Sequence, residues 1–580
     1  MSLTLTPRST SLLLLFSLLI ASTWDPGRAT TSYYFSASGS DSNNCRSPAS
    51  PCRTIRKVNS LTYEAGDSIL FHGGDSFTGC VMINPTRVPS KGSASNPITL
   101  DSYGSGNATL LSNCPGNLHA LLTIDGVSGV TVQNLILSAN GTQTTYGVLV
   151  QNSYSTTAPV DTIVIQNTDI SGFHCCGTTP GQYGSEIFIA GQAYATGGNC
   201  GPLNNIQVLN NKLHGAAGPT SPDDNGITGS GCGGQYNVTN VKYSGNEVWN
   251  IGGHSGSTVS GNGIVANRVA NGELSFNIVH DLGGNNRGCP GPVGIWAWQS
   301  DNIVIKFNEV YRMQQLTPPA VMGCDWAAYD FDEGVTNSIY EYNYSHDNGG
   351  AAILVYNAGG GNVFRYNVSE NDDNQMLGGS GVYAIGIPGG SLSIYNNTVY
   401  RSGVFSSATP SCYTFGAPPS AVYPTGIVLA NNLCIIPASS TAEGFARYID
   451  VNNGTDIRNV TIKNNLYYSP SAVWWINARY DTLAQVQAAG WEQGSIVAAS
   501  SPAVNAGFGG TCNWSPPLAN GPQPCPSAYQ LVTGAPGIGA ALNLTQPPHN
   551  FNVGTRDYWG TAIPHTLGNG YNMGANGARH

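Results

Sequence analysis

One short motif returns along most of this chain: two or three alternating apolar positions, an Asn, one further residue and usually another apolar residue. The segments ELSFNIVHD, IVIKFNEVYR and VTIKNNLYY are three examples. Successive copies lie 24 to 35 residues apart, a spacing that is typical of repeat architectures and constrains the fold more than any property of composition. The shared asparagines are Asn211, Asn246, Asn277, Asn308, Asn343, Asn367, Asn397, Asn432 and Asn465.

The alternation inside each copy predicts a β-strand, because successive side chains of a strand point to opposite faces. The rest of each interval has room for one or two more short strands with tight turns, but not for a sizeable helix. Stacked parallel coils satisfy both conditions, since they pair every strand and bury every inward side chain. The Asn is expected at a bend, where its amide can bond backbone groups of its own coil and the next one, forming a ladder. A leucine-rich repeat is the main rival, but its consensus leucines are missing.

The N-terminal residues, the net charge and the cysteines indicate in which compartment the protein acts and which partners it can bind. Arg8, the apolar run 12–20 and small residues up to position 29 form a signal peptide, which is too short for a membrane span. We therefore expect a secreted, extracellular monomer with no membrane partner. The net charge of −10 argues against nucleic acid, because phosphates require Lys and Arg. Fourteen cysteines favour disulfides over zinc ligands. Glycosylation sequons occur at Asn107, Asn140, Asn237, Asn453, Asn459, Asn513 and Asn543, whereas Asn343 and Asn367, also in sequons, should be buried in the ladder.

Three further segments carry a family resemblance: YYFSASGSDSNNCRSPASPCRTIRKVNSL, AGDSILFHGGDSFTG and DTLAQVQAAGWEQGS. With the Asn repeat, they resemble the pectin-lyase-like superfamily of right-handed parallel β-helix proteins, including the family 9 pectate lyases. The resemblance implies an all-β, single-stranded right-handed parallel β-helix with N- and C-terminal caps, and a polysaccharide as substrate or ligand. We therefore expect four parts: a signal peptide (1–29), an N-terminal cap with the first coils (30–125), the β-helix coils (126–470) and a C-terminal cap with a short helix and loops (471–580). That helix is expected to have Asp481 as its N-cap and Gly490 beyond its end.

Stacking also predicts some of the disulfides. Cys289 and Cys324 lie at nearly equivalent places in successive coils, and strands about 4.8 Å apart can bring them within bonding range. Local bridges are expected at Cys45–Cys52 and Cys512–Cys525.

Each coil also has a strand upstream of the motif, and aligning four of these strands predicts a functional face. The segments 263–269, 294–300, 328–334 and 352–358 place Ile264, Ala266, Ile295, Ala297, Tyr329, Phe331, Ile353 and Val355 inward. The opposite parity should face solvent, because side chains alternate along a strand. It forms two columns across the coils: Val265, Trp296, Asp330 and Leu354, and beside them Asn267, Trp298, Asp332 and Tyr356.

Two tryptophans next to two aspartates suit a carbohydrate. A sugar ring can stack its CH face on an indole, and glycosidic cleavage uses one protonated and one ionised carboxyl group. Two residues apart on one strand, Asp330 and Asp332 have Cα atoms roughly 6.6 Å apart, and inverting glycosidases separate their carboxyls by about 6.5–9.5 Å. We therefore predict Asp330 and Asp332 as catalytic, with Trp296, Trp298, Tyr356 and Asn267 binding substrate. Asp325, just before the strand, adds a further carboxylate.

A second column of candidate residues follows the Asn motif. His346 and Asp347 share a coil with the aspartate pair, so we predict them as catalytic partners that orient substrate or transfer protons. Arg312, in the preceding coil, is a further predicted substrate contact. Structural interpretations stay open: the aspartates can belong to a solvated turn or a structural calcium site, stacked aromatics are ordinary in β-helices, and Asp347 with Arg312 can be a surface ion pair.

Three functions fit these residues. The first is a glycoside hydrolase that cleaves polysaccharide with Asp330 and Asp332, and it needs neither a metal nor a cofactor. The second is a calcium-dependent, pectate-type lyase, in which Ca²⁺ would bridge the acidic face and a uronate, with Arg312 or Arg268 as base. The third is a non-catalytic glycan-binding or surface protein, in which the aromatic side chains form a stacking platform.

Overall fold

The computed structural model describes the chain over residues 29–114, 119–140, 144–174, 184–193, 199–215, 224–234, 236–253, 260–286, 291–313, 325–373, 383–386, 390–402, 411–416, 426–437, 445–451, 455–504, 506–507, 528–563 and 570–577. Several predictions from the sequence lie outside these ranges: nearly all of the signal peptide, the sequons at Asn453 and Asn513, and the bridges Cys289–Cys324 and Cys512–Cys525.

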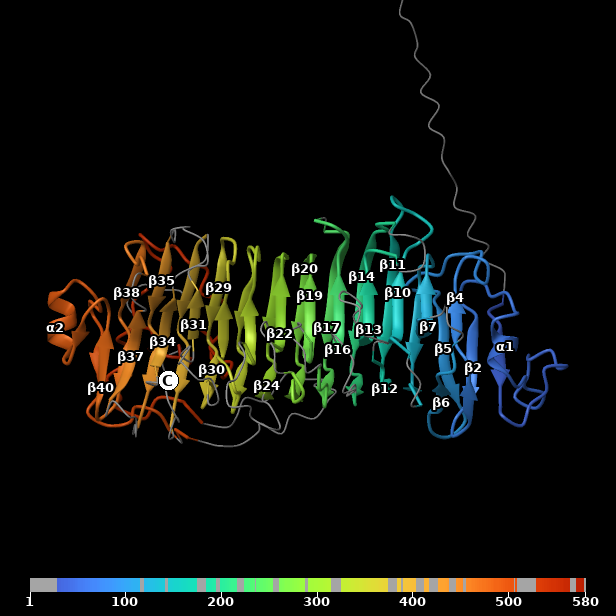
Figure 1. Cartoon of the computed structure of the whole chain (residues 1–580), viewed down its shortest axis with the longest axis horizontal. Coiled ribbons are helices and arrows are strands. Elements are labelled where there is room, and N and C mark those ends of the chain that lie inside the picture. The colour runs from blue at the N-terminus through green and yellow to red at the C-terminus, as the bar shows by residue number, and fades with distance from the viewer. Residues whose placement is uncertain are drawn as a thin grey trace, which may run out of the picture.

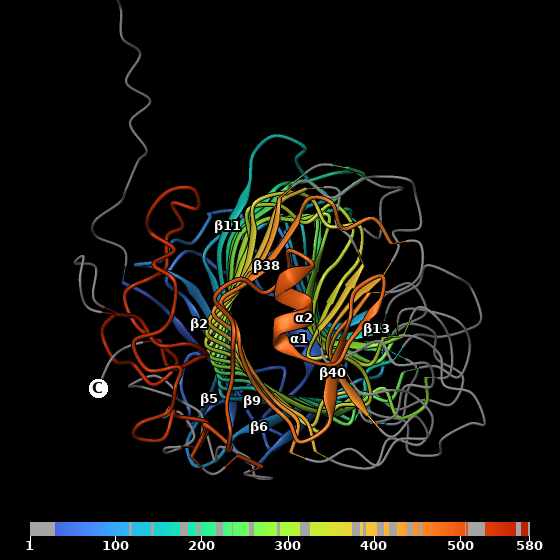
Figure 2. The ribbon, with the colours of Figure 1, turned by 90° about the vertical axis from the view of Figure 1, so that its left-hand side faces the viewer.

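The fold is a right-handed parallel β-helix, as the sequence predicts. The chain winds through three sheets in turn, so that each strand pairs with the strands one coil before and one coil after it (Figure 1). Among the described strands every pairing between coils is parallel, and β40 and β41 are the one antiparallel pair. Seen from one end, the sheets enclose a single elongated core (Figure 2).

Sheet I contains β1 (Ser32–Phe35), β2 (Ser68–His72), β5 (Ile98–Tyr103), β8 (Val130–Gln133), β11 (Val160–Gln166), β14 (Leu203–Leu209), β17 (Val238–Ser244), β20 (Val269–Ser275), β23 (Asp301–Lys306), β26 (Ile339–Glu341), β29 (Asn362–Arg365), β32 (Leu392–Tyr395), β35 (Ile427–Ala430) and β38 (Val460–Lys463).

Sheet II contains β4 (Val81–Ile83), β7 (Ala120–Asp125), β10 (Tyr146–Gln151), β13 (Gly184–Ala190), β16 (Asp224–Ser230), β19 (Asn262–Asn267), β22 (Val293–Trp298), β25 (Ala327–Phe331), β28 (Ile353–Val355), β31 (Tyr383–Gly386), β34 (Ser411–Gly416), β37 (Ala446–Val451), β40 (Ala472–Trp475) and β41 (Arg479–Tyr480).

Sheet III contains β3 (Ser76–Thr78), β6 (Ala108–Leu111), β9 (Leu135–Ser138), β12 (Asp169–Ser171), β15 (Lys212–His214), β18 (Glu247–Trp249), β21 (Ile278–Leu282), β24 (Glu309–Met313), β27 (Tyr344–His346), β30 (Val368–Glu370), β33 (Thr398–Tyr400), β36 (Leu433–Ile435), β39 (Leu466–Tyr468) and β42 (Ile496–Val497).

The Asn ladder occupies the turn between sheets I and III. From Asn211 to Asn465, the Nδ2 atom of each ladder residue donates to Oδ1 of the next at 3.0–3.2 Å. Each Oδ1 also accepts the backbone N–H of the preceding ladder residue, as Asn308 does from Asn277 at 2.9 Å. All nine side chains are buried, so the prediction that the sequons at Asn343 and Asn367 are inaccessible is confirmed. The ladder fixes the register of successive coils.

Short helices cover the two ends of the core. Helix α1 (Ile55–Val58) buries Ile55 and Val58 at the N-terminal end, and α2 (Leu483–Ala488) buries Val486 at the other (Figures 1 and 2). The prediction that Asp481 caps α2 is wrong by one residue. Thr482 is the N-cap, because its hydroxyl can accept the N–H of Gln485 while the Gln485 side chain returns to the Thr482 backbone, a capping box.

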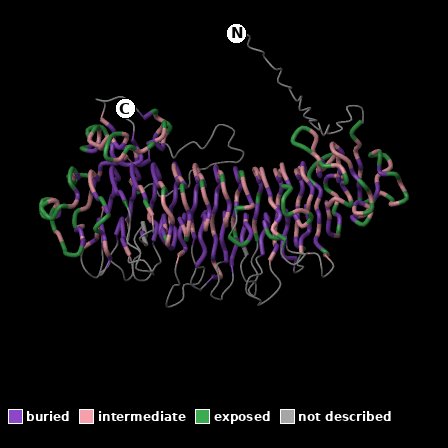
Figure 3. The backbone as a smooth tube through the Cα atoms, turned by 90° about the horizontal axis from the view of Figure 1, so that it is seen from above, coloured by how far each residue is buried: buried purple, intermediate pink, exposed green. Residues whose placement is uncertain are grey.

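The last described segments, 528–563 and 570–577, lie along the flank of the coils and not over their end (Figure 2). Their apolar residues pack against those of the turns between sheets I and III, and Asn431 exchanges hydrogen bonds with the backbone of Leu542. Burial is greatest along the coils, while exposed residues gather in the N-terminal cap, the C-terminal cap and these flanking segments (Figure 3).

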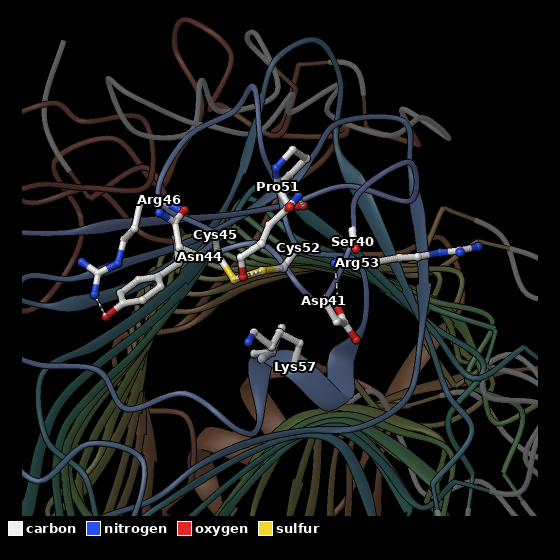
Figure 4. Close-up of a disulfide and its surroundings, with 12 residues drawn as sticks. Ser40, Asp41, Asn44, Cys45, Arg46, Pro51, Cys52, Arg53 and Lys57 are labelled. Atoms are coloured by element: carbon white, nitrogen blue, oxygen red, sulfur yellow. Dashed lines mark hydrogen bonds between the residues drawn. A yellow bond between two sulfur atoms is a disulfide. The ribbon is translucent and has the colours of Figure 1, made fainter.

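Four disulfides join described cysteines: Cys45–Cys52, Cys80–Cys114, Cys200–Cys232 and Cys412–Cys434. The first was predicted, and it closes the loop beside α1 (Figure 4). Disulfides of this kind are typical of proteins in oxidising compartments. Among the described residues, no helix is long and apolar enough to cross a membrane.

Candidate functional site

The outer face of sheet II carries the two predicted columns. In the observed register Val265 pairs with Trp296, Trp296 with Asp330, and Asp330 with Leu354. In the second column Asn267 pairs with Trp298. Asp332 is next to Trp298 in the following coil, where its backbone N–H donates to the carbonyl of Ala297. The eight residues of these strands that were predicted to point inward lie in the core, and each is at most 1% exposed. The Asn motif therefore gave the correct register for strands that lie elsewhere in the coil.

These columns form the floor of a cavity of about 480 Å³ over β13 to β28. Six of the nine predicted site residues line it. The complete lining is Phe188, Asn225, Thr228, Ser230, Asn262, Val265, Asn267, Gly291, Val293, Trp296, Trp298, Asp325, Asp330, Asp332, Glu333, Leu354 and Tyr356.

One expectation about this face is wrong. The residues that point away from the core do not all face solvent: Trp296 is only 7% exposed and Asp330 only 3%. Trp296 belongs to a small apolar cluster outside the sheet, together with Val265 and Val293. Asp330 therefore lies on the cavity floor between apolar neighbours and not on a solvated surface.

Three aspartates in the cavity have raised pKa values, and burial is the largest cause for each. Burial and the charge of Asp332 raise the pKa of Asp330 well above its usual range. Burial raises the pKa of Asp332 to about 7, with Asp325 and Glu333 adding to the effect and a bond from the Glu333 backbone opposing it. Burial raises the pKa of Asp325 to about 6, although its Oδ2 accepts the Gly291 N–H at 2.8 Å. At neutral pH this group can therefore hold both protonated and ionised carboxyls.

The hydrogen bonds of the three carboxyl groups differ. Asp332 Oδ1 accepts the Glu333 N–H at 2.7 Å. Asp330 Oδ1 is buried and has no hydrogen-bond partner among the described residues. Ionising Asp330 is therefore the most costly of the three, because a buried charge needs compensating partners.

The two indoles are fixed by neighbouring side chains. Trp296 Nε1 donates to Asn262 Oδ1 at 3.1 Å, and Trp298 Nε1 donates to Glu333 Oε2 at 3.4 Å. The guanidinium of Arg268 lies 4.4 Å from the centre of the Trp298 ring. Trp298 is partly exposed and lines the cavity, so it can present a ring face to a ligand.

The other three predicted residues lie on sheet III and do not line the cavity. His346 is buried, with Nδ1 2.9 Å from Asp347 Oδ2 and Nε2 3.2 Å from Glu309 Oε1. Arg312 does not pair with Asp347: its Nε and one terminal nitrogen donate to the two carboxylate oxygens of Asp281, each at 2.6 Å. Sharing a coil was not enough to bring these residues to the aspartates, because each coil contributes to three different faces.

The column on sheet III is a stack of rings. His214, Trp249, His280, Tyr311 and His346 follow one another with interplanar angles of 2–15° and ring centres 4.2–6.1 Å apart. The rings cover one another's faces, which is the structural packing that the sequence left open.

Sequence reasoning missed Asn262 and Glu333, which hold the two indoles. Asn262 opens β19 and is paired with Asn225 at the start of β16, with Asn262 Nδ2 donating to Asn225 Oδ1 at 2.8 Å. An Asn at equivalent positions of two coils was the available signal. Among the described residues, no group of three His, Cys, Asp or Glu side chains is arranged to hold a metal ion.

Comparisons with known proteins give one curated relative and several structural neighbours, and no family model matches the chain. A 108-residue stretch is 36% identical to a lacto-N-biosidase of Bifidobacterium longum subsp. longum; it covers 18% of this chain and only 6% of that protein. A GH136 lacto-N-biosidase from Eubacterium ramulus has a TM-score of 0.48 at 18% identity, covering 77% of this chain and 68% of that one. XylC in complex with xylose has a TM-score of 0.48 at 10% identity, with 95% and 99% coverage. Pectate lyase Pel9A gives 0.44 at 13%, with 96% and 98% coverage. At these TM-scores the neighbours add nothing to the strand pairing described above.

Proposed function

We propose that this protein is a secreted glycoside hydrolase that cleaves a neutral glycan in the cavity over sheet II. The observation that carries the proposal is the group of three carboxyls with raised pKa values beside two fixed indoles. Hydrolysis of a glycosidic bond needs a protonated carboxyl to donate to the leaving oxygen and an ionised one to act on the sugar or on water. The matched segment of a lacto-N-biosidase supports the same reaction class.

We propose a role for each of the three carboxyls from its burial and its raised pKa. Asp332, with a pKa of about 7, is the proton donor, because it stays protonated near neutral pH and can still release its proton. Asp325, with a pKa of about 6, is the ionised partner, and the Gly291 N–H stabilises its charge. Asp330 stays protonated and donates a hydrogen bond to the substrate. Asp325 thus replaces Asp330 in the catalytic pair that the sequence suggested.

The charge of the cavity favours a neutral substrate. Four of its lining residues are Asp or Glu, and the others are uncharged. A uronate would meet like charge there, whereas a neutral sugar can stack on Trp298 and accept or donate hydrogen bonds.

The roles are tested with single Asp→Asn variants, which keep the size of the side chain. Purified protein is assayed on a panel of neutral and uronate-containing polysaccharides and oligosaccharides, scoring new reducing ends and the absorbance of unsaturated products. We expect reducing ends without unsaturation. Asp325→Asn and Asp332→Asn should each lower kcat by about 10²–10⁴-fold. Asp330→Asn should lose less, about tenfold, because an amide still donates a hydrogen bond.

Asp481→Asn is the matched control, because Asp481 is exposed beside α2, far along the chain from the cavity. Its activity should equal that of the wild type. A larger loss in Asp330→Asn than in Asp325→Asn would restore the Asp330–Asp332 pair. Unsaturated products that disappear with a chelator would show the calcium-dependent lyase instead, and binding without turnover would show a glycan-binding protein.

A further inference from the structure

The cavity over sheet II is elongated along the solenoid axis, because one column of its lining residues runs through six neighbouring strands. Each member of the column pairs in register with the next, and all six line the cavity: Phe188, Thr228, Val265, Trp296, Asp330 and Leu354. Paired strands are about 4.8 Å apart, so the column is about 24 Å long. One sugar of an extended chain covers a length comparable to one strand spacing. The cavity therefore has room for more than one sugar unit.

The aspartates lie near one end of this column. From Asp330 the column continues for one strand spacing to Leu354, but for four spacings, about 19 Å, in the other direction to Phe188. The ring of Phe188 is stacked on that of Tyr146, with ring centres 4.8 Å apart, inside an apolar cluster on the outside of the sheet. We call the part of the cavity over β13, β16 and β19 the long arm.

The long arm differs in charge from the end that holds the aspartates. All the described residues that line it are uncharged: Phe188, Asn225, Thr228, Ser230, Asn262, Val265 and Asn267. The four acidic lining residues belong to β25 or lie within two residues of it. An uncharged arm lined by amides and hydroxyls suits the hydroxyl groups of a neutral sugar, because it offers both donors and acceptors.

Ser230 and Asn267 are the two residues of the long arm with unused hydrogen-bonding capacity. They pair in register at the ends of β16 and β19, and Asn267 Nδ2 donates to Ser230 Oγ at 3.3 Å. The Ser230 hydroxyl therefore keeps its proton for another acceptor. Asn267 Oδ1 is buried without a hydrogen-bond partner among the described residues, although Asn267 itself is partly exposed in the cavity. Such an acceptor costs free energy until a donor reaches it, and a sugar hydroxyl can be that donor.

The turn that follows Ser230 is held in place. The Cys200–Cys232 disulfide joins it to the neighbouring coil, and the Cys232 N–H donates to Asn237 Oδ1 at 2.7 Å. Asn237 Nδ2 donates in turn to the Gly191 carbonyl at 2.7 Å, so the Asn of this sequon has a structural role. Polar groups that are already fixed lose little freedom when they bind a ligand.

We propose that the long arm binds a second sugar unit of a neutral oligosaccharide through Ser230 and Asn267, while the unit beside the aspartates stacks on Trp298. This inference rests on the proposed function and extends its substrate from one sugar to an oligosaccharide that lies along the solenoid axis. Asn267 pairs with Trp298, and Ser230 is one strand further, so the pair lies about 4.8 and 9.6 Å from Trp298 along the axis. The sugar next to the one on Trp298 reaches both side chains, which therefore select the substrate.

The long arm is tested by titrations with neutral oligosaccharides of one to three units, built on xylose, glucose, mannose, galactose or N-acetylglucosamine, followed by tryptophan fluorescence. All proteins carry Asp332→Asn, so that the sugars bind without being cleaved. In at least one series we expect Kd to fall about tenfold from one unit to three. Ser230→Ala/Asn267→Ala should bind three units about tenfold more weakly than the parent, but one unit equally well, because a single sugar binds at Trp298.

Thr99→Ala/Thr131→Ala is the matched control. Thr99 and Thr131 also pair in register in neighbouring coils, but they belong to sheet I and do not line the cavity. This variant should bind every oligosaccharide like the parent.

Three results would overturn the long arm: no binding in any series, a Kd that is the same for one and three units in every series, or a loss in Ser230→Ala/Asn267→Ala that is equal for one and three units. The hydrolase proposal fails separately. If the parent prefers three units but the wild type releases no reducing ends, the long arm belongs to a protein that binds glycans without cleaving them. If reducing ends appear while Kd does not depend on chain length, the hydrolase stands and the long arm falls.

Discussion

Asn308→Ala tests the ladder at its centre. The Asn308 side chain is fully buried; its Oδ1 accepts from the N–H and the Nδ2 of Asn277, and its own Nδ2 donates to the carbonyls of Leu274 and Lys306 and to Asn343 Oδ1. The substitution leaves the buried Asn277 N–H without an acceptor, which costs about 2 kcal/mol. It also removes the two bonds that join the Asn308 side chain to those of Asn277 and Asn343, which contribute about 1 kcal/mol each. We therefore expect the free energy of unfolding to fall by about 4 kcal/mol.

The assay is urea denaturation followed by circular dichroism at the strand signal. The matched control is Asn302→Ala, because Asn302 lies in the same coil but is exposed and donates a single side-chain bond, to Asn271 Oδ1 at 2.8 Å. That variant should lose only about 1 kcal/mol, because the φ of Asn302 is 55°, a left-handed conformation that Asn adopts more readily than Ala. If Asn308→Ala unfolds at the same urea concentration as Asn302→Ala, the ladder does not stabilise the coils and the reasoning is wrong.

Three further predictions concern pH and packing. Burial lowers the pKa of His346, but its bonds with Asp347 and Glu309 outweigh this and raise the pKa to about 9. The stability that this raised pKa supplies is complete below about pH 6.5 and is lost as the pH rises through 9, so wild type should lose more stability over that range than His346→Gln in urea titrations at each pH. Activity should peak between about pH 6 and 7, where Asp325 is ionised and Asp332 protonated, and a profile that is flat from pH 4 to 9 would contradict these roles. Gly294→Ala should lower stability by about 1–3 kcal/mol in thermal melts, because its Cβ would be 2.5 Å from Val310 Cγ1 and 2.7 Å from the Ala328 carbonyl.

The repeat in the sequence predicted much of the site because register is a property of the whole coil. Once the ladder asparagines are aligned, a strand about ten residues upstream is aligned as well, and Trp296 falls beside Asp330 as observed. Alignment does not say which of three faces a residue occupies. His346 and Asp347 share a coil with the aspartates, as predicted, but they lie at another face of the coil and do not line the cavity.

Burial and partners outside the strands were harder to predict. Asp330 points away from the core yet is buried, because apolar neighbours from adjacent coils surround it, and strand parity carries no information about that second layer. Asp325 precedes β25 and has no place in the alternating pattern, so the sequence could offer it only as an additional carboxylate. Its importance comes from its raised pKa and its bond with Gly291.

Asp330 should reduce the stability of the fold that holds it. In the sheet it lies between Trp296 and Leu354, both apolar, and its Oδ1 has no partner among the described residues. Asp330→Leu removes a buried, unsatisfied carboxyl group, so we expect the free energy of unfolding to rise by about 1–3 kcal/mol while turnover falls. Asp330→Asn should gain less, because the amide is also polar. Urea denaturation measures the change, and a lower midpoint for Asp330→Leu would mean that the carboxyl stabilises the coil. A carboxyl kept at a position where leucine would be more stable is explained by its use in the cavity, because function is the usual reason for retaining a destabilising residue.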